Sequence, residues 1–535
     1  MKLRVVGSVI SLIALVGVVL GIALFGPAFL SPANDAPGGS QTAAIAGNAI
    51  ERENAQLGTS TWKISVARTA STQIQAYANA TSVQPGKTLT FYVSTQQEGT
   101  HFWTDIYRLG WYDGDGGRLM TSIEDQVGHA QGYYDASTHQ LIGCSSCLVD
   151  KKTGLVEANW RPSYTLAVPS NWTTGVYLAK LTDANGLQTY VPFDVLSNSN
   201  SRYVVVTPDT TYAAYNDWGG YSLYTAANGQ PGETTVPTRT KADKVSFDRP
   251  YTQEAGSSQV LAFEADAIHW MERQSYDLSY ISDIDLHNDP GQLLHHSVYI
   301  SIGHDEYWTK EMRDGVEQAR DHGVGLAFLG ANASYWQVRF ERDSAGAADR
   351  TVVCYKVSTS LKDLARDPLY RKDNSRVTAQ WRDPVLARPE NALIGIMYAG
   401  FTPQRLGFPW VLSPSAKSPL LNGTDLQAGR QYGCDLVGYE WDRIFPNGAT
   451  PAGLRVLATS NTVNSAHNAD TSNTTYYIAE SGAMIFATGS INWTAALDNY
   501  QLHPDTLCPS SQVVPGAQKL MANVMEALAL KHPMQ

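Results

Sequence analysis

The chain has 535 residues, of which 43% are hydrophobic and 17% charged, and its formal net charge at pH 7 is −11. A chain of this length folds into about two to four structural units, and the composition excludes disorder on a large scale. The negative charge, with no lysine or arginine cluster in the sequence, argues against nucleic acid as a partner.

A long apolar run lies near the N-terminus. Lys2 and Arg4 precede residues 5–25, a run of 21 residues that only Gly and Ser interrupt. A helix of this length crosses a bilayer, whereas the apolar core of a cleaved signal peptide has roughly 7–15 residues. The positive charges keep that end in the cytoplasm. The sequence therefore predicts a signal anchor over residues 1–30 and an extracytoplasmic bulk in the cell membrane, or a secreted protein if the segment is cleaved.

Small and polar residues follow, and they predict a flexible linker over residues 31–60. Residues 61–197 then contain short alternating runs such as TLTFYVST, GVYLAKLTD and TYVPFDVL, separated by turn signals such as Pro85-Gly86 and Asn185-Gly186. Short strands at this spacing are typical of a β-sandwich. We therefore expect an all-β sandwich domain over residues 61–197.

The cysteines are few and unevenly spaced. Cys144 and Cys147 form one CxxC, while Cys354, Cys434 and Cys508 stand alone. A zinc ribbon needs a second close pair. Outside the cytoplasm the CxxC predicts a local disulfide, and one of the other three cysteines would remain unpaired.

After residue 198, continuous apolar strands alternate with helices. Strands are predicted at residues 203–207, 278–282, 298–302 and 325–329, and helices at residues 260–273, 309–322 and 516–531. Thr309 would cap the second of these helices and Gly323 would end it. Apolar strands of this kind are buried on both faces, as in a parallel sheet covered by helices. We therefore expect an α/β domain with a parallel sheet over residues 198–535.

Two loops after these strands carry candidate chemistry. GHDEYW (303–308) follows one strand and GANASYW (330–336) the next. Ligands bind at the carboxyl ends of strands in such sheets, and a crossover helix makes these two strands neighbours. Tyr307 and Tyr335 are therefore expected at equivalent strand ends. Two phenols and a carboxylate are hard oxygen donors, which suit Fe(III) better than zinc. A polar loop in which Asp305 and Glu306 favour the helix dipole explains GHDEYW equally well.

Several other chemistries are absent from the sequence. It contains no G-x-S-x-G elbow, no HExxH, no phosphate-binding G-x-x-x-x-G-K and no cysteine in the loops after the strands. Metal-assisted chemistry or no chemistry remains.

Long and unusual motifs carry a family resemblance. They are SIGHDEYWTKEMRDGVEQARDHGVGLAFLGANASYWQVRFE, TVVCYK, WRDP, CDLVGYEWD and ATGSINWTAALD, which span roughly residues 201–530, with a looser match through DIYRLGWYDGDGGRL. The sequence resembles the large (beta) subunit family of N,N-dimethylformamidase. The resemblance implies an amidohydrolase with mononuclear iron held by two tyrosines and one glutamate, on a domain like that of class I amidotransferases.

Carried over to this sequence, the resemblance implies Tyr307, Tyr335 and Glu440 as the metal ligands, the last in GYEWD. Gly438 stands where the known enzyme has a histidine, two residues before its glutamate ligand. This departure argues against dimethylformamide as the substrate. The alternatives are core packing for the two tyrosines and a pairing with Arg443 for Glu440.

The first functional hypothesis is a membrane-anchored, extracytoplasmic, metal-dependent hydrolase of a C–N bond in a small amide. The metal would polarise the carbonyl and lower the pKa of bound water. His304 or Glu306 would orient or deprotonate that water, and Asn332 would donate to the oxyanion. The alternatives are a backbone hydrogen bond for His304, a charge at the helix N-terminus for Glu306 and a turn for Asn332.

The second hypothesis is a non-catalytic surface protein that binds a glycan or polymer. The rings of Tyr212, Tyr215, Trp218 and Tyr221 would stack on apolar sugar faces. The sequence leaves open the substrate or ligand and whether the chain forms a homo-oligomer.

Overall fold

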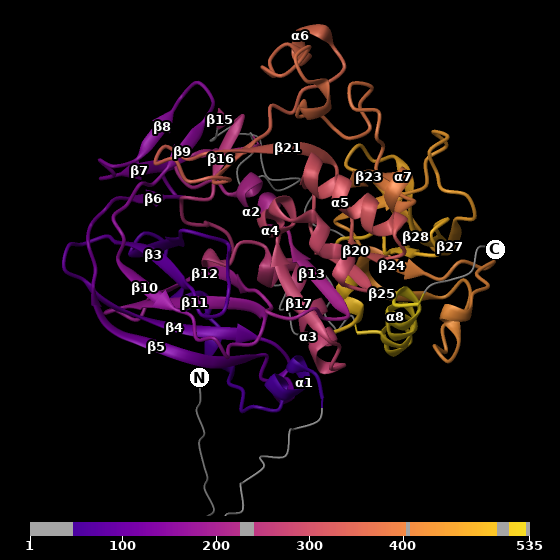
Figure 1. Cartoon of the computed structure of the whole chain (residues 1–535), viewed down its shortest axis with the longest axis horizontal. Helices are drawn as coiled ribbons and strands as arrows, with labels where there is room; N and C mark the ends of the chain where they lie inside the picture. Colours follow the sequence, from indigo (N-terminus) through magenta and orange to yellow (C-terminus); the bar gives the residue numbers. More distant parts are fainter. Residues whose placement is uncertain (1–46, 225–239, 403–406, 500–512, 531–535) are drawn as a thin grey trace, which may run out of the picture. The chain divides into compact units, whose positions relative to one another are not determined.

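Strands make up most of the regular structure in the computed structural model, which describes residues 47–224, 240–402, 407–499 and 513–530 (Figure 1). The amino-terminal part forms a three-stranded sheet in the order β1-β3-β10 and a five-stranded sheet in the order β2-β12-β11-β4-β5. The strands are β1 (Ile74–Ala78), β2 (Ser82–Val83), β3 (Thr88–Thr95), β4 (His101–Leu109), β5 (Gly117–Val127), β10 (Tyr164–Ala167), β11 (Gly175–Asp183) and β12 (Gln188–Val195).

Apolar side chains from both sheets fill the space between them. Side chains alternate across a strand, and β3 accordingly alternates between buried and more exposed positions along most of its length. Phe91 of β3 packs edge-on against Phe193 of β12, with ring centroids 6.1 Å apart, and Tyr177 of β11 lies 5.5 Å from the same ring. The short alternating runs of the sequence therefore form one apolar core.

A seven-stranded sheet holds the strands predicted after residue 198. Its order is β17-β13-β18-β20-β29-β28-β27. The strands are β13 (Tyr203–Thr207), β17 (Leu278–Ser282), β18 (Val298–Gly303), β20 (Gly325–Gly330), β27 (Arg455–Val463), β28 (Ala469–Ile478) and β29 (Met484–Ala487). The first five in this order pair in parallel, whereas β28 and β27 pair antiparallel.

The predicted strands and helices of this part are confirmed as individual elements. The helices are α2 (Asp209–Tyr215), α3 (Ala265–Arg273), α4 (Asp283–Asn288), α5 (Lys310–Asp321), α6 (Leu361–Leu364), α7 (Asn391–Ile394) and α8 (Pro515–Leu528). Thr309 caps α5 as expected, because its side chain accepts a hydrogen bond from the Met312 amide, and the backbone turns at Gly323 with φ of 91°.

The expected fold class is wrong. We predicted an α/β domain with a parallel sheet like that of class I amidotransferases, but strands in many sheets dominate the described residues, of which 21% are helical. Unbroken apolar strands indicate burial on both faces and correctly predicted the parallel pairing of β17, β13, β18 and β20, but they did not predict how many strands the rest of the chain would add. From Trp336 onward the chain adds mostly strands, and it extends the sheet in antiparallel fashion through β28 and β27.

Smaller sheets complete the described structure. One has the order β16-β22-β21-β19, and the pairs are β6-β7, β8-β9, β14-β15, β23-β26 and β24-β25. The strands are β6 (Tyr133–Asp135), β7 (Gln140–Ile142), β8 (Leu148–Asp150), β9 (Leu155–Glu157), β14 (Tyr221–Ser222), β15 (Thr240–Lys241), β16 (Lys244–Ser246), β19 (Tyr307–Thr309), β21 (Trp336–Glu341), β22 (Thr351–Val353), β23 (Met397–Phe401), β24 (Phe408–Val411), β25 (Gln431–Val437) and β26 (Glu440–Arg443).

Two further predictions concern the N-terminus and the cysteines. The predicted signal anchor lies outside the described residues, and among the helices that are described none is long and apolar enough to span a bilayer. Helix α1 (Ala49–Asn54) begins inside the segment predicted as a linker. The Cys144–Cys147 disulfide is confirmed, Cys354 is a buried free thiol and Cys434 is disulfide-bonded.

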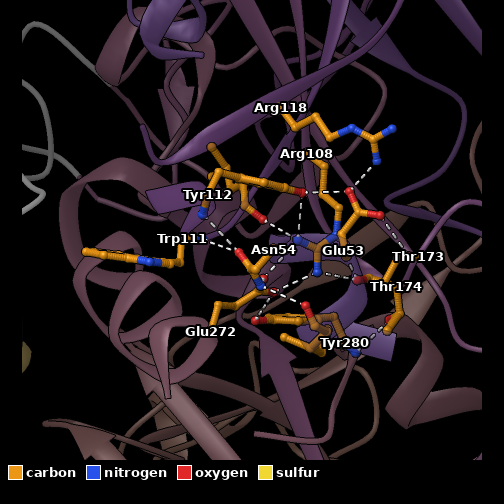
Figure 2. A network of polar contacts seen from close by, with 12 residues as sticks. Glu53, Asn54, Arg108, Trp111, Tyr112, Arg118, Thr173, Thr174, Glu272 and Tyr280 are labelled. Carbon is orange, nitrogen blue, oxygen red and sulfur yellow. Dashed lines mark hydrogen bonds and ion pairs between the residues drawn. The ribbon is translucent and has the colours of Figure 1, made fainter. Parts of the chain in front are cut away.

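A buried ion pair joins the five-stranded sheet to helix α3 (Figure 2). Arg108 of β4 donates to both carboxylate oxygens of Glu272 on α3, at 2.7 and 2.9 Å, and both side chains are fully buried. Asn54 of α1 and Tyr280 of β17 also donate to Glu272, at 2.7 and 3.0 Å. The Arg108 guanidinium further donates to the Thr174 carbonyl. Helix α1, strand β4, the segment at Thr174 and the consecutive elements α3 and β17 are thereby fixed to one another.

Candidate functional site

The two candidate loops run side by side, as their neighbouring strands predict. β18 pairs with β20 in register from Val298 with Gly325 to Gly303 with Gly330. Beyond the strands, the Tyr335 amide donates to the Glu306 carbonyl at 2.8 Å. A Cβ on Gly330 would lie 1.9 Å from the Gly303 carbonyl oxygen, so glycine permits this close approach.

The Glu306 carboxylate lies at the centre of a buried polar network. Tyr215 of α2 donates to its Oε2 at 2.8 Å, and the Tyr224 hydroxyl lies 3.0 and 2.9 Å from its two oxygens. His304 Nε2 lies 3.3 Å from Oε2. Burial raises the pKa of Glu306, but the neighbouring His304, Lys356 and Tyr215 outweigh it and hold this pKa below its usual value. Glu306 is therefore a carboxylate at neutral pH.

His304 lies between two carboxylates that come from different parts of the chain. Its Nε2 is 3.3 Å from Glu306 and 3.4 Å from Oε2 of Glu440, the first residue of β26. Burial lowers the pKa of His304, but the charges of Glu440 and Glu306 outweigh it and raise the pKa to about 10. The imidazole is therefore protonated at neutral pH. Its positive charge lies between the carboxylates of Glu306 and Glu440 and attracts both.

Asn332 binds Glu440 directly. Its Nδ2 donates to Glu440 Oε2 at 3.0 Å, and its backbone amide donates to Asp442 Oδ1 at 2.8 Å. Its backbone is left-handed, with φ of 60°, a conformation that asparagine tolerates better than most residues. Its Oδ1 is buried and has no hydrogen-bond partner in the described part of the chain.

Tyr307 is fully buried, and its phenol contacts that of Tyr224. The ammonium of Lys356 lies over these rings, 3.4 Å from the Tyr224 centroid and 5.1 Å from that of Tyr307. Burial lowers the pKa of Lys356 to about 8, although Glu306 opposes this shift. Burial and the charge of Glu306 raise the pKa of Tyr307 well above its usual value, so in this state the phenol is neutral.

Tyr335 lies at the edge of the network. Its ring is 5.1 Å from that of Tyr398 and 5.0 Å from the Arg382 guanidinium carbon. Burial raises the pKa of Tyr335, Arg382 lowers it, and the charges of Glu306 and other carboxylates raise it further. The backbone amide of Tyr335 ties it to the GHDEYW loop, whereas none of the contacts among the described residues joins its phenol to Tyr307 or Glu440.

Sequence reasoning missed two residues of this network, Tyr224 and Lys356. Lys356 belongs to the TVVCYK motif and Tyr224 follows β14, so both are far from GHDEYW in the sequence. In the sequence, only their surroundings pointed to them: Tyr224 lies in a segment rich in aromatic residues, and Lys356 lies in a motif that carries the family resemblance.

The available donors fit a hard metal ion. Among the described residues no group of three His, Cys, Asp or Glu side chains could hold a metal, and the donors that lie together here include phenol oxygens. Tyr307 and Glu440 are buried in one network, and the unpartnered Oδ1 of Asn332 adds a further oxygen. Oxygen donors of this kind match a hard cation better than a soft one.

The glycan-binding hypothesis expected exposed rings. Tyr212, Tyr215 and Trp218 are instead buried, and Tyr221 is partly buried. These rings pack inside the protein, so they do not offer a stacking surface for a sugar.

A comparison with models of protein families identifies the family of this chain. The family model described as N,N-dimethylformamidase beta subunit-like, C-terminal, matches residues 104–505, which is more than half of the chain. The chain belongs to this family. The matched range of this N,N-dimethylformamidase beta subunit-like family includes all the candidate site residues, which are His304, Glu306, Tyr307, Asn332, Tyr335 and Glu440.

Other comparisons add little to the family assignment. No curated protein matches the chain. A solved structure of a cycloisomaltooligosaccharide glucanotransferase from Paenibacillus sp., complexed with cycloisomaltoheptaose, is 9% identical, with 64% of this chain and 62% of that chain covered and a TM-score of 0.16. This chain thus spans less than two thirds of that protein, and so low a TM-score carries no argument.

Gly438, two residues before Glu440, contributes only backbone contacts. The Gly438 amide donates to Ser490 Oγ at 3.0 Å, and its carbonyl accepts from the Asn492 amide at 3.0 Å. The imidazole that contacts Glu440 comes from His304 in the GHDEYW loop.

Proposed function

We propose that this protein is an iron-dependent hydrolase of a carbon–nitrogen amide bond. The observation that carries the proposal is the buried network that joins Tyr307, Glu306, His304 and Glu440 in a chain of this family. Burying charges and phenols is costly unless they are paired and hydrogen-bonded, and perturbed pKa values cluster at functional sites.

Tyr307, Tyr335 and Glu440 would hold Fe(III). A bound cation of this kind supplies Lewis acidity, which polarises a carbonyl group. The high pKa values of Tyr307 and Tyr335 reflect burial among carboxylates, and a cation favours the ionised form of a phenol because opposite charges attract.

Side chains of the protein would supply the base and the acid for this reaction. Glu306 is a carboxylate at neutral pH and is held by Tyr215 and Tyr224, so it is the candidate base that accepts a proton from water. His304 is protonated and carries the proton that can be donated to a leaving amine. Asn332 donates to Glu440 through one hydrogen of its side-chain amide, and the second hydrogen of that amide would donate to the oxyanion.

The cellular setting is part of the same proposal. The apolar run at residues 5–25 would anchor the chain in the cell membrane, and the folded part would act outside the cytoplasm on a small amide. The Cys144–Cys147 disulfide supports this setting, because disulfides persist mainly in oxidising compartments.

The decisive experiment is spectroscopic. The full chain, expressed with ample iron, should contain iron and show a visible absorption band from phenolate bound to Fe(III). Tyr307→Phe and Tyr335→Phe should each weaken or shift the band and Glu440→Gln should lower the iron content, while Tyr133→Phe, on the distant β6 hairpin, should change neither. A colourless, iron-free wild type would refute the proposal.

A further inference from the structure

Two buried side chains, those of Thr210 and Asp283, support the backbone carbonyl of Tyr307. Asp283, the first residue of α4, and Thr210 of α2 are both fully buried. Thr210 Oγ1 lies 2.6 Å from the Tyr307 carbonyl oxygen and also contacts Asp283 Oδ2. The Thr210 amide also points to Asp283 Oδ2, at 3.2 Å.

Only one protonation state of Asp283 provides a hydrogen for each of these contacts. A threonine hydroxyl has one hydrogen, and a backbone carbonyl can only accept. If Thr210 donates to Tyr307, its contact with Asp283 needs a hydrogen from the carboxyl group. If Thr210 donates to an ionised Asp283, two oxygens face each other at 2.6 Å with no hydrogen between them. Only the protonated acid satisfies both contacts.

The surroundings of Asp283 favour the same state. Its Oδ1 is buried and has no hydrogen-bond partner among the described residues. The titratable groups that face it are Asp305 after β18, Asp209 on α2 and Tyr299 on β18. Burial, followed by the charges of Asp305 and Asp209, raises the pKa of Asp283 well above its usual value. All of these groups are acids, so none of them neutralises an ionised Asp283.

We propose that Asp283 is a neutral carboxylic acid that positions Tyr307 through Thr210. The carboxyl O–H donates to Thr210 Oγ1, and the Thr210 O–H donates to the Tyr307 carbonyl. Asp283 touches no reacting atom, so it is a positioning residue. The consequence for metal binding rests on the proposed function, whereas the neutral acid itself does not depend on that function.

Support of the Tyr307 backbone matters because Tyr307 is a proposed metal ligand at the start of a short strand. Tyr307 begins β19, a strand of three residues that passes directly into α5. A metal-ligand side chain keeps its geometry only when the shell behind it is fixed. The Asp283–Thr210 hydrogen-bond chain fixes the Tyr307 backbone to α4 and α2, in addition to its covalent connection to α5.

The test compares neutral and apolar replacements in the full chain. Asp283→Asn keeps a neutral group that can donate to Thr210, whereas Asp283→Leu keeps a similar volume without a donor. An acid whose pKa is raised by folding makes the protein lose stability as pH rises above its unfolded pKa of about 3.9. The Tm of wild type, measured from about pH 4 to about pH 8, should therefore fall relative to that of Asp283→Asn, which lacks the ionisable group.

Asp283→Leu should be less stable than Asp283→Asn at every pH. A Tm difference between wild type and Asp283→Asn that stays constant with pH, or that favours wild type as pH rises, overturns the neutral acid. In iron-loaded protein, Asp283→Asn should keep the phenolate band of wild type and Asp283→Leu should shift or weaken it; an unchanged band in Asp283→Leu overturns the positioning role. A wild type without iron refutes the proposed function, while the pH series still decides the state of Asp283.

Discussion

Arg108→Met tests whether the buried ion pair of Figure 2 stabilises the fold. Methionine has nearly the length of arginine, so the substitution removes the guanidinium while the apolar stem remains. Glu272 then keeps the donors Asn54 and Tyr280 but loses both bonds to Arg108. The Thr174 carbonyl loses its two contacts with the guanidinium as well.

The expected loss follows from these contacts. Removing one partner of a buried ion pair costs about 3–5 kcal/mol, because the other charge stays buried without compensation. The two remaining donors to Glu272 place this variant at the lower end, so we expect a loss of about 3 kcal/mol in the free energy of unfolding. In Arg108→Met with Glu272→Leu no charge remains buried, and much of that loss should be recovered.

Equilibrium unfolding in urea measures both variants. With a slope of about 3 kcal/mol per M, Arg108→Met should lower the midpoint by about 1 M, and the double variant should lower it by clearly less. A midpoint shift under about 0.3 M for the single variant would correspond to less than about 1 kcal/mol. That outcome would show that the pair contributes no more than an ion pair at the surface.

Two further predictions concern the site. Burial lowers the pKa of Lys356 from 10.5 to about 8, so the folded protein binds fewer protons than the unfolded chain between these values and gains stability as pH rises through them. In metal-free protein, the Tm of wild type relative to Lys356→Met should therefore rise over this range, and parallel pH profiles would contradict the assignment. Gly330→Ala should separate β18 from β20, because its Cβ would lie 1.9 Å from the Gly303 oxygen; we expect a loss of about 3 kcal/mol in the free energy of unfolding and loss of bound iron. The control Gly291→Ala, whose Cβ would approach no atom closer than 3.5 Å, should lose neither.

Local patterns predicted the elements that carry the site. The cap at Thr309, the glycine after α5 and the apolar strands on either side define the segment from β18 to β20 from nearby residues alone. Their parallel pairing follows from the crossover helix, and it sets GHDEYW beside GANASYW. These features depend on interactions over a few residues, which a sequence displays directly.

The class of the fold and the rest of the site depend on distant segments. The antiparallel extension of the sheet by β28 and β27 follows from pairing partners that no local pattern specifies. Tyr224 and Lys356 reach Tyr307 and Glu306 across more than forty residues in each case, as the numbering shows. Only the folded chain reveals that these groups share one buried space.

The donor atoms proposed for this site favour Fe(III) among the ions that could complete it. We propose that Tyr307 and Tyr335 as phenolates and Glu440 as a carboxylate bind the ion. Protonated His304 and Lys356 lie in the same buried space, and ionised Glu306 offsets one of these two positive charges. Anionic oxygen atoms are hard donors, which suit a hard trivalent cation better than Zn²⁺, an ion that also accepts nitrogen and sulfur ligands. Iron-replete protein should therefore keep its metal in competition with Zn²⁺, and loss of the phenolate band on addition of equimolar Zn²⁺ would contradict this preference.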